Sequence, residues 1–250
     1  DMSQARSKAS MFFKEGQWDK GQERIMEGLQ LDPEDMALYD AWEEGLVENE
    51  QPTTSVWIAA RKSLPRDPVV AARLGLAYIE SGEKSKASLA CNEALELEAN
   101  LATITGGGGA GGGGGGGGKA RSEYLQRVDK GLGLLAWQSH EYEQVIKFYK
   151  KVVEANTASG TTDVESEARL AIAYVEMCDE VGIKETALGL GKKMIASDPE
   201  FAGGHYVLGK EAAIRGDTMA SVPHLRRAMQ YAKGRIGANN KTEYMFELVI

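Results

Sequence analysis

The sequence contains few cysteines, and it has fewer basic than acidic residues. The 250 residues include two cysteines, Cys91 and Cys178, and neither has a CxxC neighbour or histidines at ligand spacing. We therefore expect both to pack as small apolar groups. Lys and Arg number 29 against 37 Asp and Glu, so the formal charge is −8. Because nucleic-acid affinity rests on clustered basic residues, no nucleic-acid partner is expected.

Long apolar runs are missing as well. Hydrophobic residues make up 42% of the chain, which is enough for a core, yet no run approaches the roughly 18 apolar residues that a membrane span needs. The first ten residues, DMSQARSKAS, carry no apolar signal region. We expect a soluble protein without a transmembrane segment, in the cytoplasm or the periplasm. The basic segment 224–235 leaves peripheral association with a membrane complex open.

Motifs for catalysis and for cofactor binding are also lacking. The sequence contains no Gly-x-Ser-x-Gly, no Cys-His pair at helical spacing and no acidic metal box. His205 and His224 could approach one another, but two histidines without a third ligand are a weak metal site. The sequence therefore predicts no enzyme, no cofactor and no metal. An enzyme with an unrecognised site is the alternative.

One stretch departs from ordinary composition. Gly106 to Gly118 consists of twelve glycines and one alanine. With Lys119 it matches most of a phosphate-binding P-loop, but Ala120 stands where the loop needs a hydroxyl and no strand is expected before it. Three interpretations remain: residues of unknown identity written as glycine, an engineered linker, or a native low-complexity loop. Helical backbone there would favour the first, because polyglycine does not choose a helix.

The rest of the chain contains a repeated pattern. Its clearest copy is RLGLAYIESGEKSKASLACNEALELE, residues 73–98. Leu74, Tyr78 and Leu95 fit the facing sides of two amphipathic helices joined by a tight turn, while the small residues Gly75 and Ala87 let those helices approach closely. Other copies carry Leu132-Gly133, Leu170-Ala171 and Leu208-Gly209 at equivalent places.

This pattern resembles the tetratricopeptide repeat (TPR), a helix-turn-helix unit of about 34 residues. Pro33 and Pro68 lie 35 residues apart, and Leu132, Leu170 and Leu208 follow one another at intervals of 38. The interval from Leu74 to Leu132 is 58 residues and contains the glycine tract. Six units result, and their predicted ranges are 2–35, 36–69, 68–101, 126–159, 160–201 and 202–235.

The resemblance implies an all-α fold, a right-handed α-solenoid of about six TPR units. We expect units 1 to 3 in residues 1–101, a Gly-rich junction in 102–125 that forms a loop or an extra helical segment, and units 4 to 6 in 126–235. Residues 236–250 are expected to form a C-terminal capping segment, because terminal elements of a solenoid cover an otherwise exposed apolar face.

In such solenoids the first helix of each repeat lines the concave side, and its inward-facing residues recur with helical spacing. The resemblance therefore implies a non-enzymatic adaptor that binds a partner peptide or helix in this groove, with Trp137 and Tyr206 as aromatic anchors. The competing interpretation is that these side chains pack against neighbouring helices. The predicted contact residues are Leu76, Ile79, Lys130, Leu134, Trp137, Ile172, Val175, Tyr206 and Lys210.

The same register bears on two further kinds of interaction. Some family members hold a partner's C-terminal carboxylates in a clamp of Lys, Arg and Asn, and this sequence lacks both asparagines and one lysine at the corresponding positions, which hold Arg6, Ser10, Trp42, Val69 and Arg73. A clamp is not expected. The alternative function is a self-assembling scaffold on an organelle or a membrane-bound complex, of the kind found on magnetosomes, with a homo-oligomer as its working form.

Overall fold

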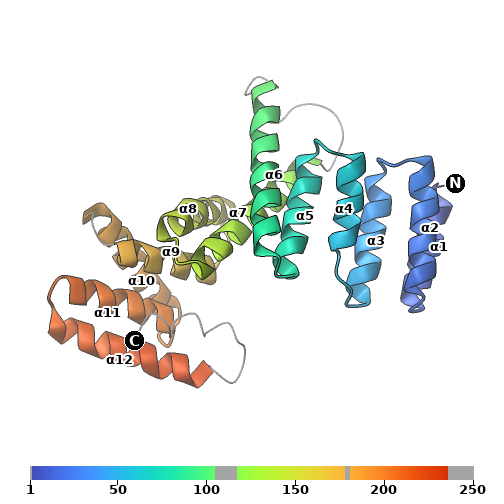
Figure 1. Cartoon of the computed structure of the whole chain (residues 1–250). Coiled ribbons are helices and arrows are strands. Elements are labelled where there is room, and N and C mark those ends of the chain that lie inside the picture. The colour runs from blue at the N-terminus through green and yellow to red at the C-terminus, as the bar shows by residue number, and fades with distance from the viewer. Residues whose placement is uncertain (1, 105–116, 178–180, 236–250) are drawn as a thin grey trace. The chain divides into compact units, whose positions relative to one another are not determined.

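The computed structural model describes residues 2–104, 117–177 and 181–235, and within these ranges the chain forms twelve helices and no strand (Figure 1). The helices follow one another as six pairs. Their bounds are α1 Met2–Lys14 and α2 Trp18–Leu31, α3 Met36–Glu48 and α4 Thr54–Ser63, α5 Pro68–Glu80 and α6 Lys84–Ile104, α7 Gly117–Gln138 and α8 Tyr142–Ser159, α9 Val164–Met177 and α10 Val181–Ser197, α11 Ala202–Ile214 and α12 Thr218–Arg235.

The chain divides into two compact units, Asp1–Gly131 (unit 1) and Leu132–Ile250 (unit 2). The division falls inside α7, whose first part packs with unit 1 and whose last turns belong to unit 2. Half of the predicted Gly-rich junction, residues 105–116, and all of the predicted capping segment lie outside the described residues. Gly117 and Gly118 belong to the start of α7, while the backbone of the rest of the tract is likewise outside the described part.

A left-handed residue follows the first helix of most pairs. Gly16, Gly82 and Gly216 have φ of 71°, 75° and 77°, two positions after α1, α5 and α11 end. The next amide donates to the carbonyl five residues back, as from Glu83 to Tyr78 at 2.9 Å. This bond closes the helix end and reverses the chain, and glycine favours it because it has no Cβ. Glu50 takes the equivalent place after α3.

Small residues let the two helices of a pair approach, as the Leu-Gly pattern predicts. A Cβ added to Gly75 on α5 would lie 2.9 Å from the amide nitrogen of Cys91 on α6, and one on Gly209 of α11 would lie 3.0 Å from the amide nitrogen of Leu225 on α12. Cys91 is fully buried, and burial raises the pKa of its thiol to about 12. The expected packing role of Cys91 is therefore confirmed. Cys178 lies outside the described residues.

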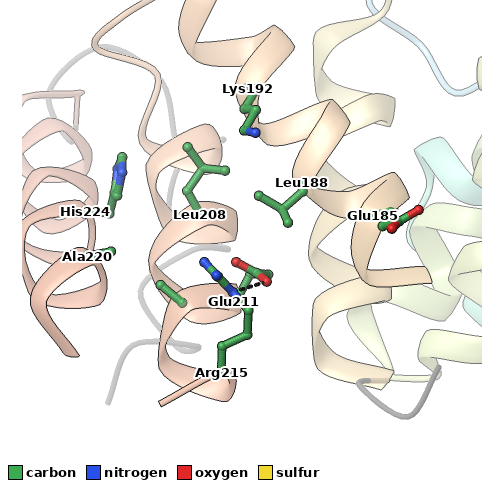
Figure 2. Close-up of a pocket in the computed structure, with 9 residues that line it drawn as sticks. Glu185, Leu188, Lys192, Leu208, Glu211, Arg215, Ala220 and His224 are labelled. Atoms are coloured by element: carbon green, nitrogen blue, oxygen red, sulfur yellow. Dashed lines mark ion pairs between the residues drawn. The ribbon is translucent and has the colours of Figure 1, made fainter. Parts of the chain in front are cut away.

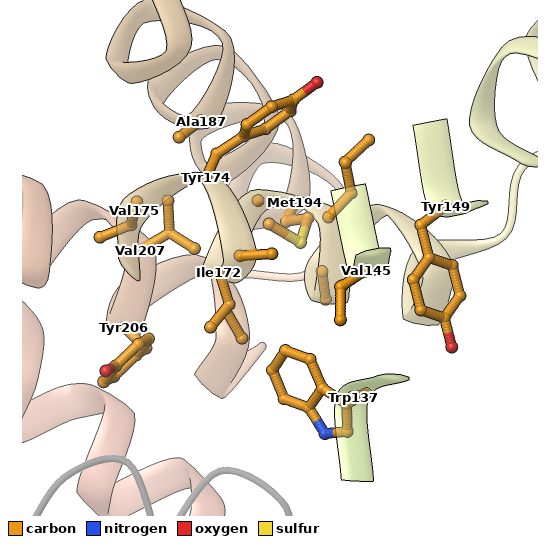
Figure 3. Close-up of a cluster of buried hydrophobic side chains, with 14 of the residues drawn as sticks. Trp137, Val145, Tyr149, Ile172, Tyr174, Val175, Ala187, Met194, Tyr206 and Val207 are labelled. Atoms are coloured by element: carbon orange, nitrogen blue, oxygen red, sulfur yellow. The ribbon is translucent and has the colours of Figure 1, made fainter. Parts of the chain in front are cut away.

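Each unit has its own hydrophobic core. In unit 1 the largest fully buried side chains include Trp57, Ile25 and Leu38, contributed by α4, α2 and α3. In unit 2 the core joins side chains from α7 to α12 and includes Tyr149 and Ile172 (Figure 3). Since neighbouring helix pairs share these clusters, each pair buries its apolar stripe only in the presence of the next.

Candidate functional site

The first helices α3 and α5 of unit 1 each carry a stripe of acidic and apolar side chains that the core covers only in part. On α3 the residues opposite the buried stripe are Asp40, Glu44 and Val47, spaced four and three apart, and Glu48 follows. On α5 the less buried stripe runs through Val69, Leu76 and Glu80, with Ile79 beside it. We call this surface the first-helix face, defined as Asp40, Glu44, Val47, Glu48, Val69, Leu76, Ile79 and Glu80.

Arg73 joins the two stripes of this face. Its guanidinium forms ion pairs with Asp40 and with Glu43 of α3, although Asp40 and Arg73 lie 33 residues apart in the sequence. The guanidinium carbon lies 3.8 Å from the ring centroid of Trp57 and 5.0 Å from that of Tyr124 on α7. This stacking and pairing holds the side chain at 10% exposure. Arg73 is therefore engaged within the protein and is not an open clamp for partner carboxylates.

The first-helix face is negatively charged, because its carboxylates, Asp40, Glu44, Glu48 and Glu80, outnumber the cation beside them, Arg73. Trp57 donates its indole N–H to Glu43 at 2.7 Å, which leaves that carboxylate fixed on the α4 side. Glu44, Glu48 and Glu80 are exposed. Beside Glu44 and Glu48 on α3, Val47 is 60% exposed, one of several exposed apolar side chains of unit 1 that include Leu31 and Leu89. An apolar centre with an acidic border results.

Four of the residues predicted for the groove lie in the core of unit 2. Trp137, Ile172, Val175 and Tyr206 are between 1% and 5% exposed. Figure 3 shows Trp137, Ile172 and Tyr206 in the cluster that also contains Val207 and Met194. These side chains have a packing role, and their contact with a partner stays a prediction.

Tyr206 is also fixed by a polar contact. Its hydroxyl donates to Glu176 of α9 at 2.7 Å, and Lys210 approaches the same carboxylate at 3.3 Å. Burial, and then the hydrogen bond to Glu176, raise the pKa of Tyr206. Two of the predicted contact residues, Tyr206 and Lys210, therefore tie α11 to α9.

The remaining predicted contact residues are half-buried. Leu76 and Ile79 lie on the first-helix face, where a Cβ added to Gly131 of α7 would collide with Ile79. Lys130 and Leu134 lie on α7. Leu76 and Ile79 are thus half-buried next to Gly131 of α7 in unit 1, and four of the nine predicted residues lie in the core of unit 2.

Unit 2 also contains a pocket between α10, α11 and α12 (Figure 2). Its volume is about 470 Å³. The side chains that line it are Glu185, Leu188, Lys192, Leu208, Glu211, Ala212, Arg215, Ala220 and His224. His224 stands out in the sequence as one of three histidines, whereas Glu211 does not, because a carboxylate in a helical pattern normally lies on the solvated face.

His205 and His224 meet, as their places in one predicted repeat suggest. Their Nδ1 atoms are 3.0 Å apart, and His205 Nε2 lies 2.9 Å from the carbonyl oxygen of Pro199. Because a carbonyl only accepts, His205 donates from Nε2, so its Nδ1 accepts a hydrogen bond from Nδ1–H of a neutral His224. Burial, His205 and Arg227 lower the pKa of His224, in that order.

Within the part of the chain that the structure describes, no group of three or more His, Cys, Asp or Glu side chains could hold a metal ion. Among the helices of the same residues, none combines the length and the apolar character of a membrane span.

Solved structures resemble this chain over most of its length, although no protein-family model and no curated protein matches it. YrrB, a TPR protein with an unusual peptide-binding site, is 13% identical over 90% of this chain and 98% of its own, with a TM-score of 0.61. PilF of Pseudomonas aeruginosa is 14% identical over 99% and 98%, with a TM-score of 0.56.

A third structure is MamA, from residue 41 to its end, of Desulfovibrio magneticus RS-1. It is 16% identical over 80% of this chain and 96% of its own, with a TM-score of 0.54. Identities this low show the fold alone, and the six helix pairs described above agree with that fold. The fold predicted from the sequence is confirmed: this chain is an all-α solenoid with the tetratricopeptide-repeat fold.

Proposed function

We propose that the chain is a non-enzymatic adaptor that holds a segment of a partner protein on the first-helix face of unit 1. The observation that carries this proposal is Val47, an apolar side chain left 60% exposed beside Glu44 and Glu48. Exposed apolar surface with a polar border is typical of protein interaction sites. YrrB, which has the same fold and a peptide-binding site, supports the same kind of use for this chain.

The chemistry of the face selects the partner. Its carboxylates favour Lys and Arg, and its apolar centre favours one or two aliphatic or aromatic side chains. A basic amphipathic helix or a basic extended segment presents both. Leu76 and Ile79, which are predicted contacts, belong to this face, whereas Trp137 and Tyr206 would have to leave the core of unit 2 to touch a partner.

Affinity capture from the cells that make the protein tests this proposal. The bait variants are Val47→Asp and the double variant Glu44→Lys with Glu48→Lys, and both are expected to lose partners that the unchanged chain retains. Leu89→Asp is the matched control for the first variant, since Leu89 is an exposed apolar residue on α6 at 73%. Glu96→Lys, also exposed on α6, controls for the change of charge.

Circular dichroism must show the same helix content in all baits. Capture of the same partners at the same yield by Val47→Asp and by Leu89→Asp would contradict the proposal. Capture lost equally in both variants would do so too, because it would mean that the first-helix face has no special role.

Self-assembly is a second candidate function, and one observation favours it. On α12 the side chains of Met219, Val222 and Met229 are exposed by 87%, 39% and 40%, at spacings of three and seven that place them on one side of the helix. Light scattering of the purified protein over a range of concentrations tests this candidate. A mass that stays at one chain at every concentration would exclude it.

A further inference from the structure

The pocket of unit 2 has apolar walls and a buried carboxylate. Leu188 of α10, Leu208 and Ala212 of α11, and Ala220 of α12 supply the apolar lining. Glu211, on α11 between them, is 2% exposed. Figure 2 shows its carboxylate directed from α11 toward α10. A site with mainly apolar lining and few polar groups is typical of pockets that bind small groups.

One oxygen of this carboxylate lacks a partner within the described structure. Glu211 Oε1 forms an ion pair with Nε of Arg215 at 2.6 Å, one helical turn away. Glu211 Oε2 is buried and accepts no hydrogen bond. Buried acceptors are normally satisfied, because their desolvation is otherwise uncompensated. A group that enters the pocket with an N–H donor would complete the site.

His224 lies in the same lining. Its Nδ1–H is used by His205, which leaves Nε2 with a lone pair as long as the ring is neutral. The lowered pKa of His224 keeps the ring neutral near pH 7. Among the side chains that line the pocket, Lys192 included, Glu211 Oε2 is the buried polar atom without a hydrogen-bond partner in the described structure.

The geometry of the carboxylate distinguishes between two kinds of cation. A guanidinium prefers both oxygens of one carboxylate, and Arg215 already takes Oε1. An ammonium is a compact point charge that needs one oxygen at a time. We propose that the pocket between α10, α11 and α12 binds a primary alkylammonium group, with Glu211 Oε2 as the acceptor, Leu188 and Leu208 around the methylenes, and Ala220 and His224 in the α12 wall.

This chemistry has two sources, a free aliphatic amine or the lysine side chain of a partner protein. Titrating the ¹⁵N-labelled full chain with pentylammonium chloride, at constant ionic strength, tests the shared chemistry. We expect saturable amide shifts at Leu208, Ala212 and Ala220. Pentanoate, which has the same chain length and the opposite charge, is expected to cause none.

Variants locate the site. Glu211→Gln keeps the shape of the side chain and should weaken pentylammonium at least tenfold. Glu185→Gln removes an exposed carboxylate of the same pocket and should change the affinity less than twofold. Ala220→Phe fills the space without changing any charge and should also abolish the shifts, so the test does not depend on the folding of a single variant.

Nα-acetyl-lysine-N-methylamide separates the two sources, because its backbone amine and carboxyl groups are blocked and its side-chain ammonium is free. Binding equal to that of pentylammonium supports a partner's lysine side chain, and binding of pentylammonium alone supports a free amine. The proposal is overturned if pentylammonium produces no saturable shift, or if Glu211→Gln binds it as tightly as the unchanged chain does.

Discussion

Glu50 and His140 adopt a left-handed backbone, with φ of 55° and 56°, at the turn position where other pairs have glycine. This conformation costs an L-residue about 1–2 kcal/mol. Glycine avoids that cost, but it also stabilises the unfolded chain through its greater conformational freedom, which cancels part of the gain. We expect Glu50→Gly and His140→Gly each to raise the free energy of unfolding by about 0.5–1 kcal/mol. Urea denaturation followed by circular dichroism measures this change.

Gly82→Ala is the reverse control. No atom lies within 4 Å of a Cβ added to Gly82, so only the φ of 75° opposes the substitution. The variant should lose about 1 kcal/mol of stability. If Glu50→Gly were instead destabilising, backbone strain would not be the dominant property of this turn.

Arg73 is the most connected charged residue of unit 1. Arg73→Met keeps an unbranched side chain but removes the cation from Asp40 and Glu43 and from the Trp57 ring. Because Asp40 is 46% exposed, solvent screens part of the loss, and we expect destabilisation by about 2 kcal/mol. Thermal unfolding measures it.

The comparison for Arg73 is Arg24→Met, which breaks an ion pair with Glu27 whose side chains are 39% and 50% exposed. That variant is expected to change stability by at most about 0.5 kcal/mol. Equal effects of the two substitutions would contradict the special role of Arg73.

Single residues mark the limit of prediction from the sequence. Arg73 and Glu211 look like ordinary helix-surface charges in the sequence, because what distinguishes them comes from outside their own helix. The partners of Arg73 lie 33 and 30 residues away. Glu211 differs from other glutamates by the α10 and α12 side chains that surround its pocket.

At the scale of elements, the histidine pair links α11 to α12. His224 has an ordinary pKa of about 6.5 when unfolded and a lowered one when folded. The unfolded chain therefore binds more protons below about pH 6.5, so the free energy of unfolding should fall as the pH drops from 6.5 through the folded pKa. Thermal unfolding across this pH range measures it.

His224→Gln should lack this part of the pH dependence, while His140→Gln, which changes an exposed histidine, should keep it. If the curves of His224→Gln and the unchanged chain stayed parallel below pH 6.5, protonation of His224 would not be coupled to the contact between α11 and α12.

The last turn of α7 shows how packing against neighbouring helices decides the role of a side chain. Trp137 is 5% exposed in the core of unit 2, so Trp137→Ala should lower the free energy of unfolding by about 3–5 kcal/mol. Leu134 is half-buried, so Leu134→Ala should lower the free energy of unfolding by less than Trp137→Ala does. Denaturant unfolding followed by circular dichroism compares them.

This expectation separates a packing role from a binding role. A Trp137→Ala chain that is as stable as the unchanged one but captures fewer partners would favour the groove predicted from the sequence. Loss of stability without a selective loss of partners would favour packing alone.

For the whole molecule, the formal charge of −8 and the carboxylates of the first-helix face act in the same direction. Capture of a basic partner on this face should therefore weaken as NaCl is raised, because salt screens exposed charges beyond about 10 Å at 0.1 M. Association rates, measured by surface plasmon resonance once a partner is captured, should fall more than dissociation rates rise. Binding that is independent of salt would place the main contacts on an apolar surface instead.

The sequence by itself determined the helix pairs and their order. Hydrophobic spacing, the Leu-Gly dipeptides and the turn glycines are local properties. Each affects the backbone or the packing of residues only a few positions away in the sequence. The helix pairs α1–α2 to α11–α12 follow one another in the predicted order, although α7 begins at Gly117, within the predicted junction.

Only the tertiary structure decided which side of each first helix remains open. Val47 and Trp137 are both apolar residues of a first helix, yet one is 60% exposed and the other 5%. Periodicity places a residue on a face of its own helix, but its exposure depends on the neighbouring helices that cover that face. The same limit applies to charge, since Arg73 and Glu211 acquire their roles from groups that other helices bring to them.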